Sequence, residues 1–262
     1  MRPKNSKRSQ SKLLASTEAA PFAIHNANSN CPVLLVCDHA SDRFPQSLGS
    51  MGLDHAARQS HLAIDIGARA VTEELAERLG ATAVICQYSR LIIDCNRDLM
   101  DFDIFLESSD GVEVPGNADL TEDDKDKRAQ DIYWPYHHAI ETQINRLKEL
   151  GRPPIFISIH SFTPIMEGEA RPWEMGVLWD KDSVTADSFL KQLSSEGYVV
   201  GDNQPYSGKG PRNFTINYHA ERNFLQHVSI EMRQDLIGHK NGITSMANIL
   251  CKVINSIAAL DS

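Results

Sequence analysis

The sequence predicts an α/β fold in three layers, with helices on both sides of a central sheet. Short apolar runs of strand length alternate with segments whose apolar residues recur at helical spacing. No internal repeat and no Gly/Ser-rich or Pro-rich linker divides the 262 residues, of which 41% are apolar and 23% charged. We therefore expect a single domain with a large core over residues 21–262.

The N-terminus differs in composition from the rest of the chain. Residues 1–17 are basic and serine-rich, with no acidic residue. They lack the apolar core of a secretory signal, although organelle transit peptides have a similar composition. We interpret residues 1–20 as a flexible tail that packing orders in part.

The first expected elements are strands around one helix. The run PVLLVC (32–37) reads as a buried strand. Apolar residues then recur at helical spacing over residues 64–79, and Gly80 stands where a helix would end. Two β-rich runs follow, ATAVICQ (81–87) and RLIIDC (90–95), and we expect strands at both.

A loop rich in Asp and Gly covers roughly residues 100–120 and leads into a long helix. Thr121 and Asp124 have the spacing of an N-terminal capping pair, and Pro135 predicts a kink or a break. Further strands are expected at PIFISIH (154–160), MGVLW (175–179) and HVSIEMR (227–233), and further helices near 183–196 and 240–260.

Charge and cysteine content narrow the possible partners and location. The net charge of −9 does not favour binding to nucleic acid or to an anionic membrane. No run approaches the roughly 20 apolar residues that span a bilayer. The five cysteines are scattered without a CxxC pair, which favours reduced thiols in a cytoplasmic protein.

Polar residues gather at the ends of the predicted strands, where α/β sheets bind their ligands. They are His39, Asn96, Arg97, His160, Ser161, Glu231 and Arg233. Two further acids are candidates for the same site: Asp42 lies three residues after His39, and Asp65 lies at the start of the first long helix.

These residue types suit a hydrolytic metal site. Two histidines and one carboxylate can bind zinc and leave a position open for water, and a separate glutamate can move the water's proton. Arginine matches a substrate carboxylate with two parallel hydrogen bonds. Structural roles stay open for the acids beside them: Asp94 could pair with Arg97, and Asp38 could cap the next turn.

The same residues lie within motifs that resemble the N-formylglutamate amidohydrolase family from about Cys31 to Ile237. The motifs are CDHASDRFP (37–45), HLAIDIGA (61–68), YSRLIIDCNR (88–97), PGN (115–117), PYHHAI (135–140), SIHSFTP (158–164), RPW (171–173), GDNQPYSG (201–208) and SIEMRQDLI (229–237).

The resemblance implies a phosphorylase/hydrolase-like fold similar to that of zinc carboxypeptidases and aspartoacylases, with a mixed sheet. It implies that His39 and His160 bind a divalent metal, most simply zinc, and that Glu231 is the general base. Asp65 is the favoured third ligand, and Asp42 is the alternative. Asn96 and Arg97 would hold the substrate carboxylate.

The implied reaction is hydrolysis of an N-formyl amino acid, best N-formyl-L-glutamate to L-glutamate and formate, as in histidine catabolism. A deacylase of another N-acyl amino acid or short peptide, and a non-catalytic binder of small acids, are the alternatives. We expect further substrate contacts or orienting groups at Arg90, His137, Ser161, Asn203, Tyr206, His219 and Arg233. No G-x-S-x-G motif supports Ser161 as a nucleophile, and the sequence does not fix the oligomeric state.

Overall fold

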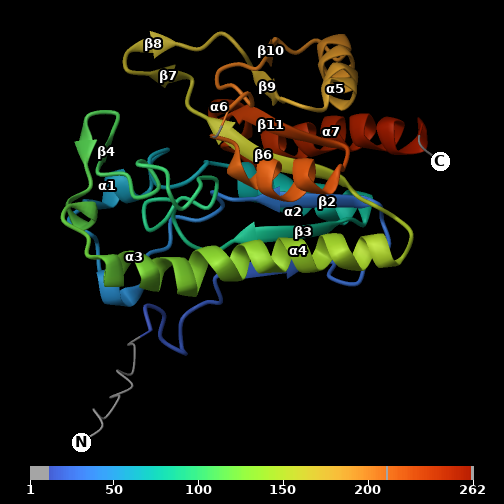
Figure 1. The fold of residues 1–262 in the computed structure, drawn as a ribbon. Helices are drawn as coiled ribbons and strands as arrows, with labels where there is room; N and C mark the ends of the chain where they lie inside the picture. The colour runs from blue at the N-terminus through green and yellow to red at the C-terminus, as the bar shows by residue number, and fades with distance from the viewer. Residues whose placement is uncertain (1–11, 211, 261–262) are drawn as a thin grey trace, which may run out of the picture.

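The computed structural model describes residues 12–210 and 212–260, and its centre is a seven-stranded sheet (Figure 1). The strand order is β1-β3-β2-β6-β11-β9-β10. The strands are β1 Phe22–His25, β2 Val33–Cys37, β3 Thr82–Cys86, β6 Ile155–Phe162, β9 Met175–Leu178, β10 Val200–Asp202 and β11 His227–Arg233. β3, β2, β6 and β11 run parallel, whereas β1 and β9 are antiparallel to their neighbours β3 and β11. The predicted mixed sheet is confirmed.

Two helical layers cover the sheet (Figure 1). One contains α2 Ala68–Leu79, α5 Ser183–Ser195, α6 Gln234–Ile237 and α7 Lys240–Leu260; the other contains α3 Glu122–Arg128, the π-helical turn η3 Ala129–Tyr133 and α4 Trp134–Glu149. Successive side chains of β2 point to opposite faces, so Leu35 packs in the first layer with Leu75, and Leu34 packs in the second with Ile140. Strands buried on both faces explain the nearly continuous apolar runs in the sequence.

The remaining elements are short. They are η1 Gln46–Leu48, α1 His55–Arg58, η2 Pro115–Asn117, η4 Ile216–Ala220 and η5 Glu221–Asn223, together with the hairpins β4 Ser108–Ser109/β5 Val112–Glu113 and β7 Ile165–Met166/β8 Glu169–Ala170. Both hairpins project from the same side of the molecule (Figure 1). No helix among the described residues is long and apolar enough to cross a membrane.

Several local predictions are confirmed. Gly80 follows α2 in the left-handed region (φ +60°), and Thr121 and Asp124 form a reciprocal capping box at the start of α3. Near Pro135 the helix does not break. Its hydrogen bonding widens to a π turn just before α4, which accommodates a residue without an N–H group.

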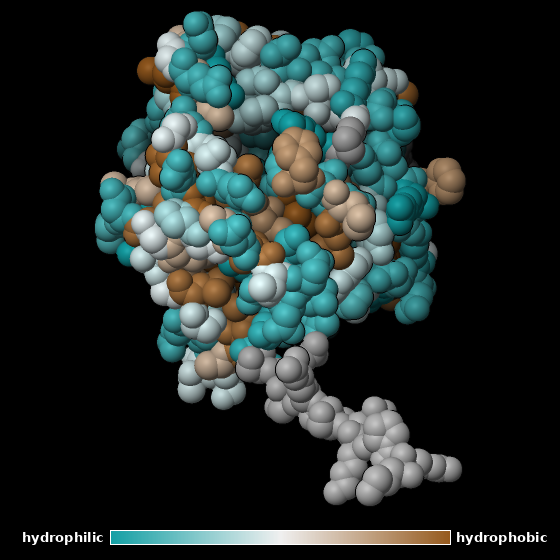
Figure 2. Space-filling model, turned by 60° about the vertical axis from the view of Figure 1, so that its left-hand side comes forward, coloured by the Kyte–Doolittle hydropathy of each residue, from teal (hydrophilic) through white to brown (hydrophobic). Residues whose placement is uncertain are grey.

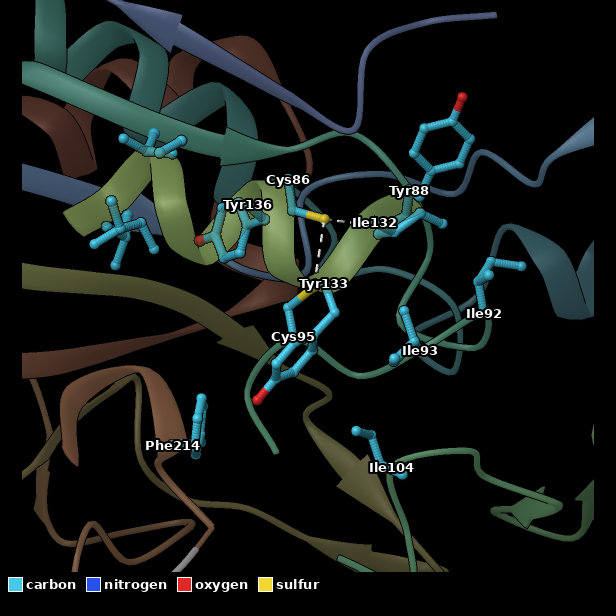
Figure 3. Close-up of a cluster of buried hydrophobic side chains, with 14 of the residues drawn as sticks. Cys86, Tyr88, Ile92, Ile93, Cys95, Ile104, Ile132, Tyr133, Tyr136 and Phe214 are labelled. Atoms are coloured by element: carbon cyan, nitrogen blue, oxygen red, sulfur yellow. Dashed lines mark hydrogen bonds between the residues drawn. The ribbon is translucent and has the colours of Figure 1, made fainter. Parts of the chain in front are cut away.

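The predicted strand at residues 90–95 is wrong, because this segment has no regular secondary structure. Side chains, and not a neighbouring strand, satisfy backbone carbonyls of this segment. Asn117 Nδ2 donates to the carbonyl of Leu91 (2.9 Å), and Arg128 Nη1 donates to that of Ile92 (2.9 Å). Figure 3 shows Ile92, Ile93 and Ile104 among the buried side chains around Tyr133. The apolar run is therefore core, although it is not a strand.

The expected tail falls partly outside the described residues, which begin at residue 12. The described part packs against the body of the protein. Leu13 is buried, and its N–H donates to Asp131 Oδ2 (2.6 Å). The Tyr88 hydroxyl donates to the carbonyl of Ala19 (2.9 Å).

Candidate active site

A cavity of about 490 Å³ opens at the carboxyl ends of the parallel strands. Figure 2 turns the side that carries β4 and β7 toward the viewer and shows hydrophobic residues in the middle of this face among hydrophilic ones. The predicted residues that line the cavity are His39, Asp65, Arg90, Asn96, Arg97, His160, Ser161, Tyr206 and Glu231. Chain segments far apart in sequence therefore meet at one site.

Three buried groups form its centre. His39 follows β2, His160 lies in the adjacent parallel strand β6, and Asp65 precedes α2. Asp65 Oδ2 lies 3.4 Å from His39 Nδ1 and 2.8 Å from His160 Nδ1. Gly67 allows this approach, because its φ is +82° and a Cβ there would lie 2.5 Å from the carbonyl oxygen of Ile237.

The far side of each imidazole meets a second acid. His39 Nε2 donates to Asp94 Oδ1 (2.7 Å), and His160 Nε2 lies 3.2 Å from Asp38 Oδ2. His160 Nε2 also lies 3.0 Å from Ser158 Oγ. On the opposite side of each ring, Nδ1 is directed toward Asp65. Carboxylates orient metal-binding histidines in this way.

This donor set fits a divalent metal ion. One ligand atom from each of His39, Asp65 and His160 lies within 4.8 Å of the other two, and His39 Nδ1 has no hydrogen-bond partner among the described residues. Asp38, Asp65 and Asp94 are buried, and Arg90 is the one guanidinium among the described residues that pairs with them, which leaves an excess of negative charges beside the imidazoles. A dication would balance those charges.

The pKa shifts show that the acids and bases of the site stabilise one another's charged forms. Burial favours neutral carboxyls, but His39 and Arg90 hold the pKa of Asp94 well below its ordinary value. Burial opposes a charged imidazole at His160, but Asp38 and Asp65 raise its pKa well above the ordinary value. The site therefore favours positive charge between its acids.

Glu231 lies beside this centre. It is on β11, directly opposite His160 of β6 in the sheet register, and its Oε2 is buried without a hydrogen-bond partner among the described residues. Burial raises the pKa of Glu231 to about 7, although His160 acts in the opposite direction. A carboxyl group with such a pKa can take up and release a proton near neutral pH.

Arg97 does not pair with Asp94, the partner that the sequence left open for it. Asp94 bonds Arg90 (2.8 Å) and His39, whereas Arg97 Nε lies 3.3 Å from Asp103 Oδ1. Its Nη1 donates to two backbone carbonyls, at 2.9 and 3.1 Å. These contacts fix the guanidinium at the edge of the cavity. The neighbouring Asn96 is fixed as well, since its Oδ1 accepts from the N–H of Thr215 (3.0 Å).

Other predicted residues do not line the cavity. Asp42 is exposed and lies outside the His–Asp–His group. Arg233 pairs with the exposed Asp235 (2.8 Å). Asn203 shapes the loop that carries Tyr206, because its Oδ1 accepts from the N–H groups of Trp179 (3.1 Å) and Gly208 (2.8 Å).

His137 and His219 also lie away from the cavity. Their rings stack, with centroids 5.1 Å apart, and His137 Nδ1 lies 2.9 Å from His219 Nε2. Tyr133, Tyr136, Phe214 and Tyr218 surround His137. This environment is that of a buried aromatic cluster.

Several residues of the site were not among the predicted ones. Asp38 and Asp94 orient the histidines, and Asp103 pairs with Arg97. His61 lines the cavity and faces Asp110 of the β4–β5 hairpin (3.3 Å). Their positions in the sequence were the available signals: Asp38 adjoins His39, and Asp94 lies two residues before Asn96.

Comparisons with known proteins identify the relatives of the chain. Residues 31–238 match the family model of N-formylglutamate amidohydrolase. The crystal structure of a gene product from Agrobacterium tumefaciens is 33% identical, with a TM-score of 0.92 over 96% of this chain and 100% of that one. The crystal structure of N-formylglutamate amidohydrolase from Ralstonia eutropha shares the fold at 18% identity, with a TM-score of 0.70 over 92% of this chain and 98% of that one. Among curated proteins, none matches the sequence.

The family match spans most of the chain, including the segments that supply His39, Asp65, His160 and Glu231. The more similar of the two crystal structures covers almost the whole chain. The chain therefore belongs to the N-formylglutamate amidohydrolase family and is a hydrolase that acts on an amide bond.

Proposed function

We propose that the protein is a metal-dependent amidohydrolase that removes the formyl group from an N-formyl amino acid. The observation that supports this most directly is the buried His39–Asp65–His160 group beside Glu231, whose Oε2 has no partner among the described residues. N-formyl-L-glutamate is the substrate that the family name suggests, and its products would be L-glutamate and formate.

His39, Asp65 and His160 would hold the metal, which we propose to be zinc. When bound there, zinc would lower the pKa of water and polarise the formyl carbonyl. Asp94 and Asp38 would keep each Nδ1 available by holding the proton of each Nε2. Arg90 bonds Asp94 and lies 3.6 Å from Asp65, so it would fix the two acids relative to each other.

Glu231 would move the proton of the reaction. It takes one proton from the attacking water as the oxygen bonds to the formyl carbon, and it gives that proton to the amide nitrogen as the C–N bond breaks. Its pKa of about 7 suits both steps near neutral pH. Formate and the free amino group are the products.

Arg97 would bind the α-carboxylate of the substrate. Its side chain is 14% exposed at the cavity edge, and its Nε and Nη1 are already held by Asp103 and two carbonyls. A fixed guanidinium loses little conformational freedom when it binds a carboxylate. Asn96, also held by the backbone, would be the adjacent polar contact.

Deacylation of other N-acyl amino acids is the second candidate, because the same chemistry cleaves any accessible amide. A non-catalytic binder of small acids is less compatible with Glu231, since a binder needs no unpartnered carboxyl group beside a metal site. We also propose that the protein acts in the cytoplasm, because all five cysteines are free thiols.

The test combines metal analysis with an activity panel. Protein purified without added metal should contain about one equivalent of zinc or a similar dication, and removal by a chelator should abolish hydrolysis of N-formyl amino acids. N-formyl-, N-acetyl- and N-succinyl-glutamate would separate deformylation from general deacylation. Full turnover by metal-free protein would refute the metal-dependent mechanism.

A further inference from the structure

The arginines that line the cavity are paired with acids of the protein. Arg90 is paired with Asp94 and Asp65. Arg97 and Arg212 both face Asp103, at 3.3 and 3.7 Å, so two guanidinium groups share a single carboxylate. This pair leaves one positive charge, which one substrate carboxylate can neutralise.

The other basic side chains on the cavity lining offer little to a second carboxylate. His61 is already opposite Asp110 (3.3 Å). Lys209 is exposed, and its Nζ lies over the Trp179 ring, 4.6 Å from the ring centroid. An ammonium in solvent contributes little to binding. Among the described lining residues, therefore, no buried cation remains for a second carboxylate.

Five apolar side chains form part of the remaining wall, beside Ser, Thr and Asn residues. Leu62, Phe162 and Leu178 are buried, and Leu106 and Met166 are half-buried, all of them lining the cavity. A carboxylate against these apolar side chains would lose hydration without gaining a countercharge, whereas an apolar group would be stabilised. Asn213 Nδ2 and Ser229 Oγ also line the cavity and have no hydrogen-bond partner among the described residues, but these neutral donors cannot neutralise a second carboxylate.

We propose that this cavity prefers N-formyl amino acids with a single carboxylate and an uncharged, mainly apolar side chain over N-formyl-L-glutamate. The inference rests on the proposed function, because it takes the substrate amide to lie at the His39–Asp65–His160 centre. Arg97 binds the α-carboxylate, and the more exposed Arg212 shares its acid partner Asp103. The apolar wall receives the side chain.

Three substrates of similar length test this preference: N-formyl-L-methionine, N-formyl-L-glutamine and N-formyl-L-glutamate. Glutamine has nearly the shape of glutamate without its charge, so the pair isolates the effect of the second carboxylate. We expect kcat/KM for methionine to exceed that for glutamate by at least about thirtyfold, with glutamine between them. Equal values for methionine and glutamate, or a preference for glutamate, would overturn the inference.

A charge introduced into the wall provides a second test. Met166→Lys places an ammonium at a half-buried position of β7, and we expect the glutamate-to-methionine ratio of kcat/KM to rise by at least about tenfold. Ile165→Lys is the matched control, because Ile165 is the exposed neighbour on the same strand (56% exposed) and does not line the cavity. Equal ratios in the two variants would overturn the assignment of this wall to the substrate side chain.

Binding measurements separate this inference from the proposed function. Titration calorimetry of the three compounds with metal-loaded Glu231→Gln needs no turnover, and we expect the same order of affinity. Tighter binding of N-formyl-L-methionine without hydrolysis by the wild-type protein would support the cavity preference and refute the proposed reaction. If the wild-type protein hydrolysed all three compounds but N-formyl-L-glutamate bound most tightly, the proposed reaction would be supported and the cavity preference refuted.

Discussion

The buried pair His137 and His219 should make the protein sensitive to acid. Burial lowers the pKa of His137 to about 4, and burial together with the neighbouring His137 lowers that of His219 to about 3. In the unfolded chain both groups titrate near 6.5. Because the folded pKa is depressed, the neutral pair stabilises the fold fully above about pH 6.5, and this stability is lost as the pH falls toward 4.

The magnitude follows from the pKa differences. Each histidine loses about 1.4 kcal/mol of stability per pH unit in this range, so lowering the pH from 7.5 to 5 removes about 2 kcal/mol per residue. The pair should therefore account for about 4 kcal/mol. Both rings are almost fully buried, 1% and 2% exposed, so solvent screens this effect little.

The double variant His137→Phe/His219→Phe tests the estimate. Phenylalanine can keep the stacked arrangement within the aromatic cluster, and replacing both partners leaves no unpaired polar group. Urea unfolding of metal-free protein at pH 7.5 and pH 5 gives the free energy of unfolding. We expect the loss between these pH values to be about 4 kcal/mol smaller in the variant than in wild type.

Two further measurements show whether His137 and His219 act in stability or in the active site. His55→Gln, at an exposed position of α1, is the control for histidine loss and should leave the pH dependence unchanged. Since neither ring lines the cavity, we expect kcat/KM of the double variant at pH 7.5 to stay within about threefold of wild type. If the variant loses as much stability in acid as wild type, the reasoning about buried neutral histidines is refuted.

Three further predictions concern the site. Asp65→Ala should lose bound metal and activity, whereas Asp42→Ala should keep both. If Asp65→Ala kept its metal, or Asp42→Ala lost it, Asp42 would replace Asp65 as the proposed third metal ligand. Glu231→Gln should keep its metal but lower kcat by about two to four powers of ten, and near-normal turnover would remove it as the general base. Arg97→Lys and amidation of the substrate α-carboxylate should each lower kcat/KM by at least about a hundredfold, roughly 2.7 kcal/mol, and should be non-additive because both break one contact. Equal turnover of acid and amide would show that Arg97 does not bind that carboxylate.

The predicted fold and the observed one agree where a segment's own sequence decides its conformation. The runs that form β2, β6 and β11 are apolar and of strand length, and α2 shows helical periodicity up to its terminal Gly80. The edge strands β1 and β10 were not predicted, because they are short and partly exposed. At residues 90–95 an apolar composition marked burial, but side chains from other segments satisfy the backbone there, so no strand forms.

The residue types of the site could be predicted from the sequence, because the ends of parallel strands bring their polar residues to one edge of the sheet. His39, His160 and Glu231 follow directly from that rule, since their strands are neighbours. The pairing among the charged residues could not be read in this way. Asp42 and Asp65 were both candidates for the third ligand, and sequence spacing alone does not rank them.

The sequence by itself determined the α/β class, the positions of the main strands along the chain and the residue types available at their ends. Only the tertiary structure decided that Asp65 approaches both imidazoles, where its N–H donates to the carbonyl of His39 (2.9 Å), and that Asp42 is exposed to solvent. It also decided that Asp94 bonds His39 and Arg90 and leaves Arg97 to Asp103. The physical reason is that secondary structure depends on neighbours in sequence, whereas ion pairing and burial depend on distances of a few ångströms between segments that only folding brings together.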